Sequence, residues 1–179
     1  MEICKTPLSG CVELLPNVLK DARGRFVKIY HQEVFTSLGL DTNFTEEYYS
    51  VSAMNTIRGL HFQVPPHDHV KCVTCVYGKI FDVVVDLRKS SPTYKQAFSI
   101  TLDADKGNIL YIPKGFAHGF QVLSETAVFL NKTTTVYHPE SESGISWNSC
   151  GIKWPNTNPM LSEKDKQLIH LDNFNTPFE

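Results

Sequence analysis

The sequence lacks the features that direct a chain to a membrane, to nucleic acid or to an acidic partner. Its N-terminus has no basic start followed by an apolar segment, and no run approaches the ~20 apolar residues of a membrane span. The 17 basic and 19 acidic residues are spread along the 179-residue chain and leave a net charge of −2 at pH 7. Because no basic cluster exists for phosphates or anionic lipids, we expect a soluble cytoplasmic protein.

Cysteine is also scarce, and its spacing does not predict a disulfide framework. The five cysteines are an odd number, so we expect reduced thiols. Cys72 and Cys75 form a C-x-x-C pair that would suit a redox centre or half a zinc site. They lie, however, in a β-branched and aromatic segment, and positions i and i+3 of a strand point to opposite faces. We therefore interpret the pair as two structural thiols.

Short strand-forming segments are abundant, and turn-rich segments separate them. Strands are predicted over residues 12–16, 25–31, 46–54, 56–63, 69–78, 79–88, 95–103, 107–113, 120–124, 126–138 and 145–148. Helical patterns occur only at 32–39 and 161–171, the second with Ser162 three residues before Asp165, as in a capping box. The pattern predicts one all-β domain over residues 1–179, an antiparallel sandwich or barrel with a short C-terminal helix.

Polar residues occupy strand faces that would otherwise be apolar core. In strand 79–88, Asp82 and Asp86 share one face with Val84. In the neighbouring strands, His61 lies on the same face as Gly59 and Gln63, and a single lysine, Lys71, opens an apolar run. If these faces line the mouth of a barrel, His61 and Lys71 meet in one cavity.

Residues 107–118 read G-x5-P-x-G-x-x-H, which resembles the second sequence motif of the cupin superfamily. That resemblance implies a jelly roll whose site lies inside the barrel, with His118 pointing inward. Many cupins hold a metal, and His67, His69 and His118 are the candidate ligands here. No glutamate follows the H-D-H, Lys71 stands near its expected place, and PPHDH is typical of a turn. A metal-dependent isomerase or dioxygenase therefore remains only an alternative, and exposed turn histidines are the simpler interpretation.

A longer series of ordered segments points to one family. The series is DARGRF (21–26), IRGLHFQ (57–63), GKIFDVVVDLR (78–88), SPTY (91–94), IPKGFAHGF (112–120), Tyr137 with Pro139, ISWN (145–148), WP (154–155) and LSEKD (161–165). In this order the chain resembles the dTDP-4-dehydrorhamnose 3,5-epimerase family from about residue 3 to residue 165. The resemblance implies a cupin-type double-stranded β-helix, a homodimer, and no metal or cofactor.

The resemblance also implies a reaction. Members of the family invert C3 and C5 of a nucleotide-linked 4-keto sugar through an enolate, for surface polysaccharide biosynthesis. His61 matches the base that removes the proton, and Asp165 matches the carboxylate that holds this histidine. Lys71 matches the cation beside the C4 oxygen, and Tyr137 matches the tyrosine that returns a proton from the opposite face.

Substrate contacts are implied in the same way. Arg23 and Arg58 match positions that meet the diphosphate, which guanidinium groups bind in a bidentate manner. Further contacts with the nucleotide sugar are expected from Phe26, Gln63, His118, Asn131 and Glu142.

Three departures from the family pattern leave the exact substrate open. Where many members have L-Y-K, this chain has Leu130-Asn131-Lys132, so a second active-site tyrosine is missing. Lys28 replaces a glutamate, and Glu46-Glu47-Tyr48 replaces the usual Q-x-N. A dTDP-, GDP- or CDP-linked hexose or heptose, inverted at C3, C5 or both, is therefore compatible with the sequence. A 3,4-ketoisomerase and a non-catalytic sugar-binding jelly roll remain competing interpretations.

Overall fold

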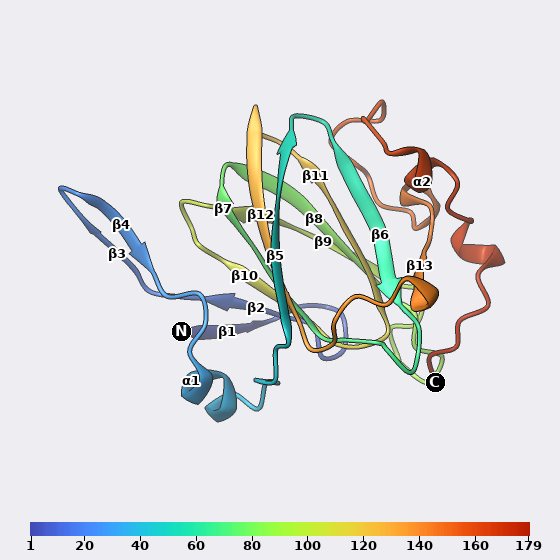
Figure 1. The fold of residues 1–179 in the computed structure, drawn as a ribbon, viewed down its shortest axis with the longest axis horizontal. Coiled ribbons are helices and arrows are strands. Elements are labelled where there is room, and N and C mark those ends of the chain that lie inside the picture. The colour runs from blue at the N-terminus through green and yellow to red at the C-terminus, as the bar shows by residue number, and fades with distance from the viewer.

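Two antiparallel sheets packed face to face form the body of the computed structural model, which describes residues 1–179 (Figure 1). The six-stranded sheet has the order β1 (Glu2–Lys5), β2 (Val12–Leu15), β10 (Ile109–Ile112), β7 (Lys71–Tyr77), β12 (Thr126–Thr133) and β5 (Glu46–Ala53). The five-stranded sheet has the order β13 (Glu142–Gly144), β6 (Ile57–Gln63), β11 (Phe116–Val122), β8 (Lys79–Asp86) and β9 (Ala97–Asp103). The predicted all-β architecture is confirmed.

Apolar side chains fill the space between the sheets and also cover the outer face of the five-stranded sheet. Val84 and Phe120 pack between the sheets against Leu110. On the outer face, Trp154 and Phe178 of the C-terminal segment pack against side chains of the strands. The ribbon of this segment lies on the right-hand side of Figure 1. All seven residues of β11 are buried because both faces of this strand are covered. Buried polar side chains on this strand, such as His118, therefore indicate a functional site.

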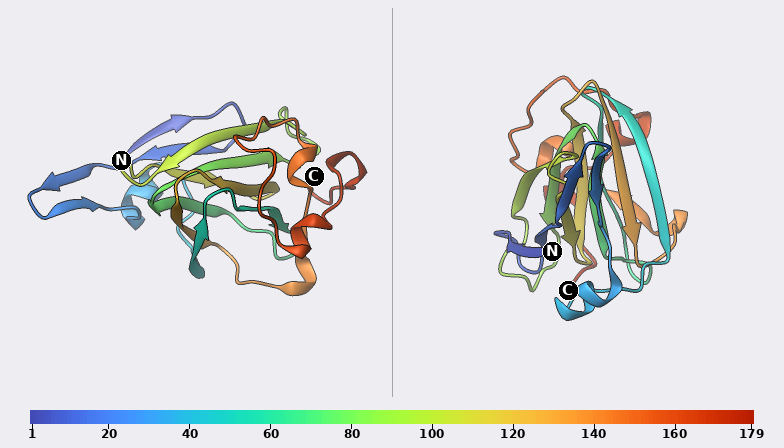
Figure 2. Two further views of the ribbon diagram at one scale, coloured as in Figure 1. Left: turned by 90° about the horizontal axis from the view of Figure 1, so that it is seen from above. Right: turned by 90° about the vertical axis from the view of Figure 1, so that its left-hand side faces the viewer.

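A two-stranded hairpin, β3 (Val18–Asp21) and β4 (Gly24–Val27), extends away from the sheets (Figures 1 and 2). The carboxylate of Asp21 organises its turn by accepting hydrogen bonds from the main-chain N–H (2.8 Å) and the guanidinium of Arg23. Leu19 and Phe26 are exposed on it, at 62% and 60% of their surfaces. The strand predicted over residues 25–31 forms only in its first part, because the pairing ends at Val27.

The helical segments are shorter than predicted. The first, α1, spans Gln32–Ser37, and α2 spans only Glu163–Lys166. Ser162 Oγ accepts the N–H of Asp165 (3.0 Å), so the predicted cap is confirmed. The helix does not continue to residue 171 because Ile169 forms an isolated bridge with Ile145 instead. With six and four residues, α1 and α2 are both too short to span a bilayer.

Two further details concern strand predictions. The segment 145–148 is not a strand, since Trp147 begins a 3-10 helix and packs edge-on against Trp154. Cys72 and Cys75 lie in β7 and join different apolar clusters on its two sides, as predicted. Burial raises the pKa of Cys72 to about 12 and that of Cys75 to about 11, so both thiols stay protonated at neutral pH.

Candidate active site

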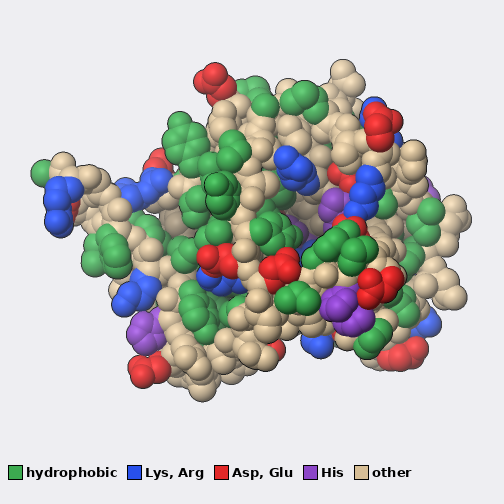
Figure 3. All heavy atoms as spheres, viewed as in Figure 1, with side chains coloured by type: hydrophobic (Ala, Val, Ile, Leu, Met, Phe, Trp, Pro, Cys, Tyr) green, Lys and Arg blue, Asp and Glu red, His purple; other side chains and the backbone are tan.

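A polar cavity of about 240 Å³ opens between β6 and β11 on one side and β5, β7 and β12 on the other. Its lining residues are Tyr48, Ser50, Arg58, His61, Lys71, His118, Gly119, Phe120, Phe129, Asn131, Ser162, Lys164 and Asp165. A second hollow adjoins it and is lined by Tyr137 and Glu142 among others. Figure 3 shows histidine and basic side chains gathered around a hollow on this face of the molecule. Most residues predicted from the family resemblance therefore meet here.

His61 and Asp165 form a hydrogen-bonded pair at the cavity wall. His61 Nε2 lies 2.5 Å from Asp165 Oδ1, although the two residues are 104 positions apart in the sequence. The imidazole keeps 30% of its surface exposed, whereas the carboxylate keeps 4%. Burial alone would raise the pKa of Asp165, but the hydrogen bond and charge of His61 outweigh burial and lower it. An ionised carboxylate thus fixes the imidazole and stabilises its protonated form.

The close approach of the paired strands β6 and β11 explains the glycine two positions before His61. A Cβ on Gly59 would lie 2.6 Å from Gly119 Cα, and Gly59 has a φ of +123°. Strands β6 and β11 therefore approach closely here, with a register irregularity between His118 and Phe120. As a result, His61 and His118 stand opposite each other in neighbouring strands.

Lys71 is buried beneath His61, and the sequence prediction that the two meet is confirmed. Its Nζ donates a hydrogen bond to the main-chain carbonyl of His61 (2.9 Å). Burial lowers the pKa of Lys71 to about 8, against the opposing effects of the Asp82 and Glu142 carboxylates. The lysine is therefore a desolvated cation whose charge is available to a substrate oxygen.

His118 and Asp82 form a second histidine–carboxylate pair deeper in the cavity. His118 Nε2 lies 2.9 Å from Asp82 Oδ2, and both side chains are buried. Burial raises the pKa of Asp82 and lowers that of His118. Asp82 was not assigned a role from the sequence, although its place on the polar face of its strand was the available signal. Its other oxygen, Oδ1, is buried with no hydrogen-bond partner.

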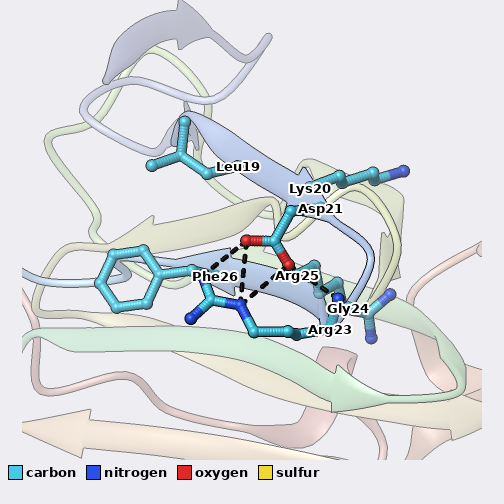
Figure 4. Close-up of a pocket in the computed structure, with 7 residues that line it drawn as sticks. All are labelled: Leu19, Lys20, Asp21, Arg23, Gly24, Arg25 and Phe26. Atoms are coloured by element: carbon cyan, nitrogen blue, oxygen red, sulfur yellow. Dashed lines mark hydrogen bonds and ion pairs between the residues drawn. The ribbon is translucent and has the colours of Figure 1, made fainter.

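The two arginines predicted to share the diphosphate are not brought together within one chain. Arg58 lines the cavity, and its Nε donates to Ser52 Oγ (2.9 Å). Arg23 and Phe26 lie instead on the extended hairpin, where Arg23 is 90% exposed (Figure 4). The hollow that they line is made by hairpin residues alone and contains none of the catalytic candidates. The separation follows from the hairpin, which carries these side chains away from the sheets.

At the rim, Tyr137 and Glu142 are joined. The Tyr137 hydroxyl donates to Glu142 Oε2 (2.5 Å), and Lys164 Nζ lies 2.5 Å from Glu142 Oε1. Burial would raise the pKa of Glu142, but these two partners lower it. Gln63 is buried, and its Nε2 donates to the carbonyl of His67 (2.8 Å) while its Oε1 accepts the N–H of His138 (2.6 Å). Its amide therefore fastens the segment that carries Tyr137.

The three histidines weighed as metal ligands lie apart. His67 stacks on His138 with ring centroids 3.5 Å apart, and His69 Nδ1 lies 3.0 Å from Thr135 Oγ1. His118 is paired with Asp82. A different group, His67, His138 and Glu140, has ligand atoms within 4.8 Å of one another, but the parallel rings do not direct their lone pairs to a common point. The geometry does not favour the metal-dependent alternative.

Sequence reasoning missed Lys164 and Tyr48. Lys164 is an ordinary helix residue by pattern, and only the fold brings it to Glu142. Tyr48 accepts a hydrogen bond from Asn131 Nδ2 (2.7 Å) across the β5–β12 pair. Both members of that pair had been noted as departures from the family pattern, which was the available signal.

Comparison with known proteins agrees with this geometry. The model of a family described as dTDP-4-dehydrorhamnose 3,5-epimerase matches residues 5–173. The chain belongs to this family. The dTDP-4-dehydrorhamnose 3,5-epimerase of Escherichia coli K12 is 43% identical over 176 residues, which cover 96% of this chain and 95% of the relative. The sequence-based predictions of the family and of a nucleotide-sugar epimerase are confirmed.

Solved structures of family members extend the match to three dimensions. The epimerase of Legionella pneumophila in complex with dTDP-4-keto-L-rhamnose has a TM-score of 0.94 and 34% identity, and the match covers 99% of this chain and 98% of that chain. A double variant of ChmJ, a 3'-monoepimerase from Streptomyces bikiniensis in complex with dTDP, has a TM-score of 0.89 and 27% identity, covering 94% and 87%. The predicted cupin-type jelly roll is confirmed.

Proposed function

We propose that this protein inverts C3, C5 or both in a nucleotide-diphosphate 4-keto sugar, in the biosynthesis of an activated sugar for surface polysaccharide. The observation that carries the proposal is the His61–Asp165 pair beside the buried ammonium of Lys71 in one polar cavity. Protons on a carbon next to a ketone are acidic, and their removal needs a base on the carbon and a positive charge at the oxygen. The site supplies both.

In the first step, His61 removes the proton from the carbon. The C–H bond breaks, its electron pair forms the enolate, and the negative charge develops on the C4 oxygen. The imidazolium that forms is stabilised by Asp165. Lys71 and His118, which line the same cavity from opposite sheets, are proposed to face the developing oxyanion.

In the second step, a proton returns from the face opposite His61. By the family resemblance alone, this role falls to Tyr137, whose hydrogen bond to Glu142 orients the phenol. Unpartnered buried polar atoms in the cavity wall, Ser50 Oγ and Asn131 Oδ1, are available for sugar hydroxyl groups. Arg58 is assigned to the diphosphate.

The remaining substrate contacts require a second copy of the chain. We propose a homodimer in which the hairpin of each copy brings Arg23 and Phe26 to the cavity of the other. The exposed apolar side chains of the hairpin and the unpaired edge of β1 support this arrangement. The relatives' names and bound ligands favour a dTDP-linked sugar, and the absence of disulfides among five thiols suits the cytoplasm.

The experiment that tests the proposal offers the enzyme thymidine, guanosine and cytidine diphosphate 4-keto sugars and identifies the products by NMR. We expect inversion at C3 or C5 with one of the three nucleotides. Movement of the carbonyl from C4 to C3 would identify a ketoisomerase instead. No change in any of the three sugars would contradict the proposal.

A further inference from the structure

Three residues line both adjoining hollows of the site: His61, Lys71 and Tyr48. The first two carry the proposed base and the oxyanion-stabilising charge. Tyr48 has no role in the chemistry described so far, yet it occupies the same central position. Tyr137, by contrast, lines only the outer hollow, although the two phenols are similarly exposed, Tyr48 at 46% and Tyr137 at 52%. The placement of Tyr48 therefore calls for a chemical explanation.

Tyr48 reaches the cavity from the sheet opposite to His61. His61 belongs to β6 of the five-stranded sheet, whereas Tyr48 belongs to β5 at the edge of the six-stranded sheet. A sugar ring held between the two sheets presents one face to each of them. Inversion of a carbon requires that the proton leave from one face and return to the other, so the two residues stand where a base and an acid are needed.

The hydrogen bond between Tyr48 and Asn131 leaves the phenolic proton free. Asn131 Nδ2 donates to Tyr48 Oη (2.7 Å), so the phenol oxygen acts as the acceptor of this bond. The hydroxyl hydrogen is then not used by the protein. In Tyr137, by contrast, the hydroxyl donates its hydrogen to Glu142. Burial raises the pKa of Tyr48 despite the opposing effect of Asn131, so the phenol is protonated at neutral pH.

Tyr48 and Asn131, which both depart from the family pattern, form one structural unit. Asn131 stands where many members have the tyrosine of L-Y-K, and Tyr48 stands where they have the asparagine of Q-x-N. The structure makes them direct register partners across β5 and β12. A tyrosine and an asparagine have thus exchanged strands, and the cavity keeps one phenol and one amide. In the ChmJ double variant, the replaced histidine and tyrosine have the same sequence separation as His61 and Asn131.

We propose that Tyr48, rather than Tyr137 as the family resemblance alone suggests, is the proton donor of the epimerisation and replaces the phenol that this chain lacks at position 131. This inference rests on the proposed function. The phenolic O–H bond breaks as the enolate carbon forms its new C–H bond, and the electron pair of the enolate oxygen re-forms the C4 carbonyl. The phenolate regains a proton from solvent, and His61 releases its proton to solvent. Asn131 is a positioning residue that holds the phenol by its oxygen.

The test separates proton removal from inversion. In deuterated water, Tyr48→Phe retains His61, so the substrate still takes up deuterium on its original face. We expect this exchange within about threefold of wild type, while inversion falls ~10²-fold or more, the range of general-acid catalysis. Tyr49→Phe is the matched control, because Tyr49 is the next residue of β5, points to the outer face and is 68% exposed. It is expected to exchange and invert like wild type.

The swapped positions of the tyrosine and the asparagine supply a second test that does not depend on one variant. Tyr48→Asn is expected to lose inversion, and Tyr48→Asn combined with Asn131→Tyr is expected to regain it to within about tenfold of wild type. Wild-type inversion by Tyr48→Phe would overturn the inference. The inference would also be overturned if Tyr48→Phe lost deuterium uptake and inversion equally and the double variant Tyr48→Asn/Asn131→Tyr restored neither. If wild type itself neither exchanges nor inverts any of the three sugars, the proposed function fails rather than the role of Tyr48.

Discussion

At the scale of single residues, the site depends on buried charges whose partners come from distant parts of the sequence. Asp165 shows how one residue serves two purposes. Its main-chain N–H completes the cap of α2 at Ser162, whereas its carboxylate holds His61. The capping pattern and the catalytic assignment, which competed as interpretations of the sequence, therefore use different atoms and are both present.

The two roles of Asp165 predict separate effects on activity and on stability. Asp165→Asn keeps the capping N–H but loses the charge that stabilises the imidazolium, so kcat is expected to fall ~10²–10⁴-fold with little change in stability. Ser162→Ala removes the cap acceptor and is expected to cost ~0.5–2 kcal/mol of unfolding free energy, with a smaller effect on kcat. Kinetics and urea denaturation of both variants check this pair. A Ser162→Ala variant with the lower kcat of the two would contradict this division of roles.

The buried ammonium of Lys71 predicts an alkaline limit to activity. Because burial lowers its pKa from 10.5 to about 8, the protonated form is lost as the pH rises through about 8. The carboxylates of Asp82 and Glu142 and the imidazoles of His61 and His118 face this group. We expect kcat/KM to fall about tenfold per pH unit above that value. Lys71→Met should be much slower and should not show this decrease of kcat/KM above pH 8. If the decrease is unchanged in that variant, another group causes it.

At the scale of elements, the sequence predicted most strands and the meeting of His61 with Lys71, because period-two patterns survive wherever one face is polar. It failed where tertiary contacts replace local pattern. Strand β1 has four residues and no distinctive pattern, yet it pairs with β2. Residues 167–171 have a helical pattern, but Ile169 pairs with Ile145 and ends the helix. The hairpin's direction could not be predicted, because it depends on contacts that no local pattern encodes.

The close approach of β6 and β11 gives a prediction at this scale. Gly59→Ala places a Cβ 2.6 Å from the backbone of Gly119 at a φ of +123°. Gly24→Ala is the matched control, since Gly24 has a φ of +127° but nothing within 4 Å of the added atom. Both variants have the strained positive φ, so the difference between their unfolding free energies measures the clash of the added Cβ with Gly119. We expect Gly59→Ala to lose ~1–3 kcal/mol more unfolding free energy than Gly24→Ala, together with most of its activity. Equal unfolding free energies in urea would show that the two strands do not approach tightly at Gly59.

At the scale of the whole molecule, the two sheets and α2 bring His61, Lys71 and Asp165 together within one chain, whereas two residues matched to substrate contacts lie on the extended hairpin. The proposed dimer makes the complete site a property of an assembly. It also explains why the hairpin carries Phe26 and Leu19 in exposed positions, where a monomer gains nothing from them. Light scattering is expected to give about twice the 20.3 kDa mass of one chain.

The proposed dimer predicts complementation between two defective chains. His61→Asn lacks the base, and Arg23→Ala lacks a diphosphate contact on the hairpin. In a mixed dimer, one cavity has His61 from the Arg23→Ala chain and Arg23 from the His61→Asn chain, so it is intact. Co-expressed chains are expected to exceed the summed activity of the separate variants at low substrate concentration. Simple additivity would place both residues in the same chain's site.

The central claim is that His61 removes a carbon-bound proton from a 4-keto sugar, and deuterium uptake tests it most directly. Wild type and His61→Asn are incubated with the nucleotide sugar in deuterated water, and mass spectrometry and NMR locate the label. Asparagine keeps much of the shape of the imidazole but does not accept a carbon-bound proton. We predict deuterium at C3, C5 or both with wild type, and uptake slower by at least ~10²-fold with His61→Asn, whose nucleotide-sugar binding stays near wild type by calorimetry. Label entering at the wild-type rate in His61→Asn would contradict the account.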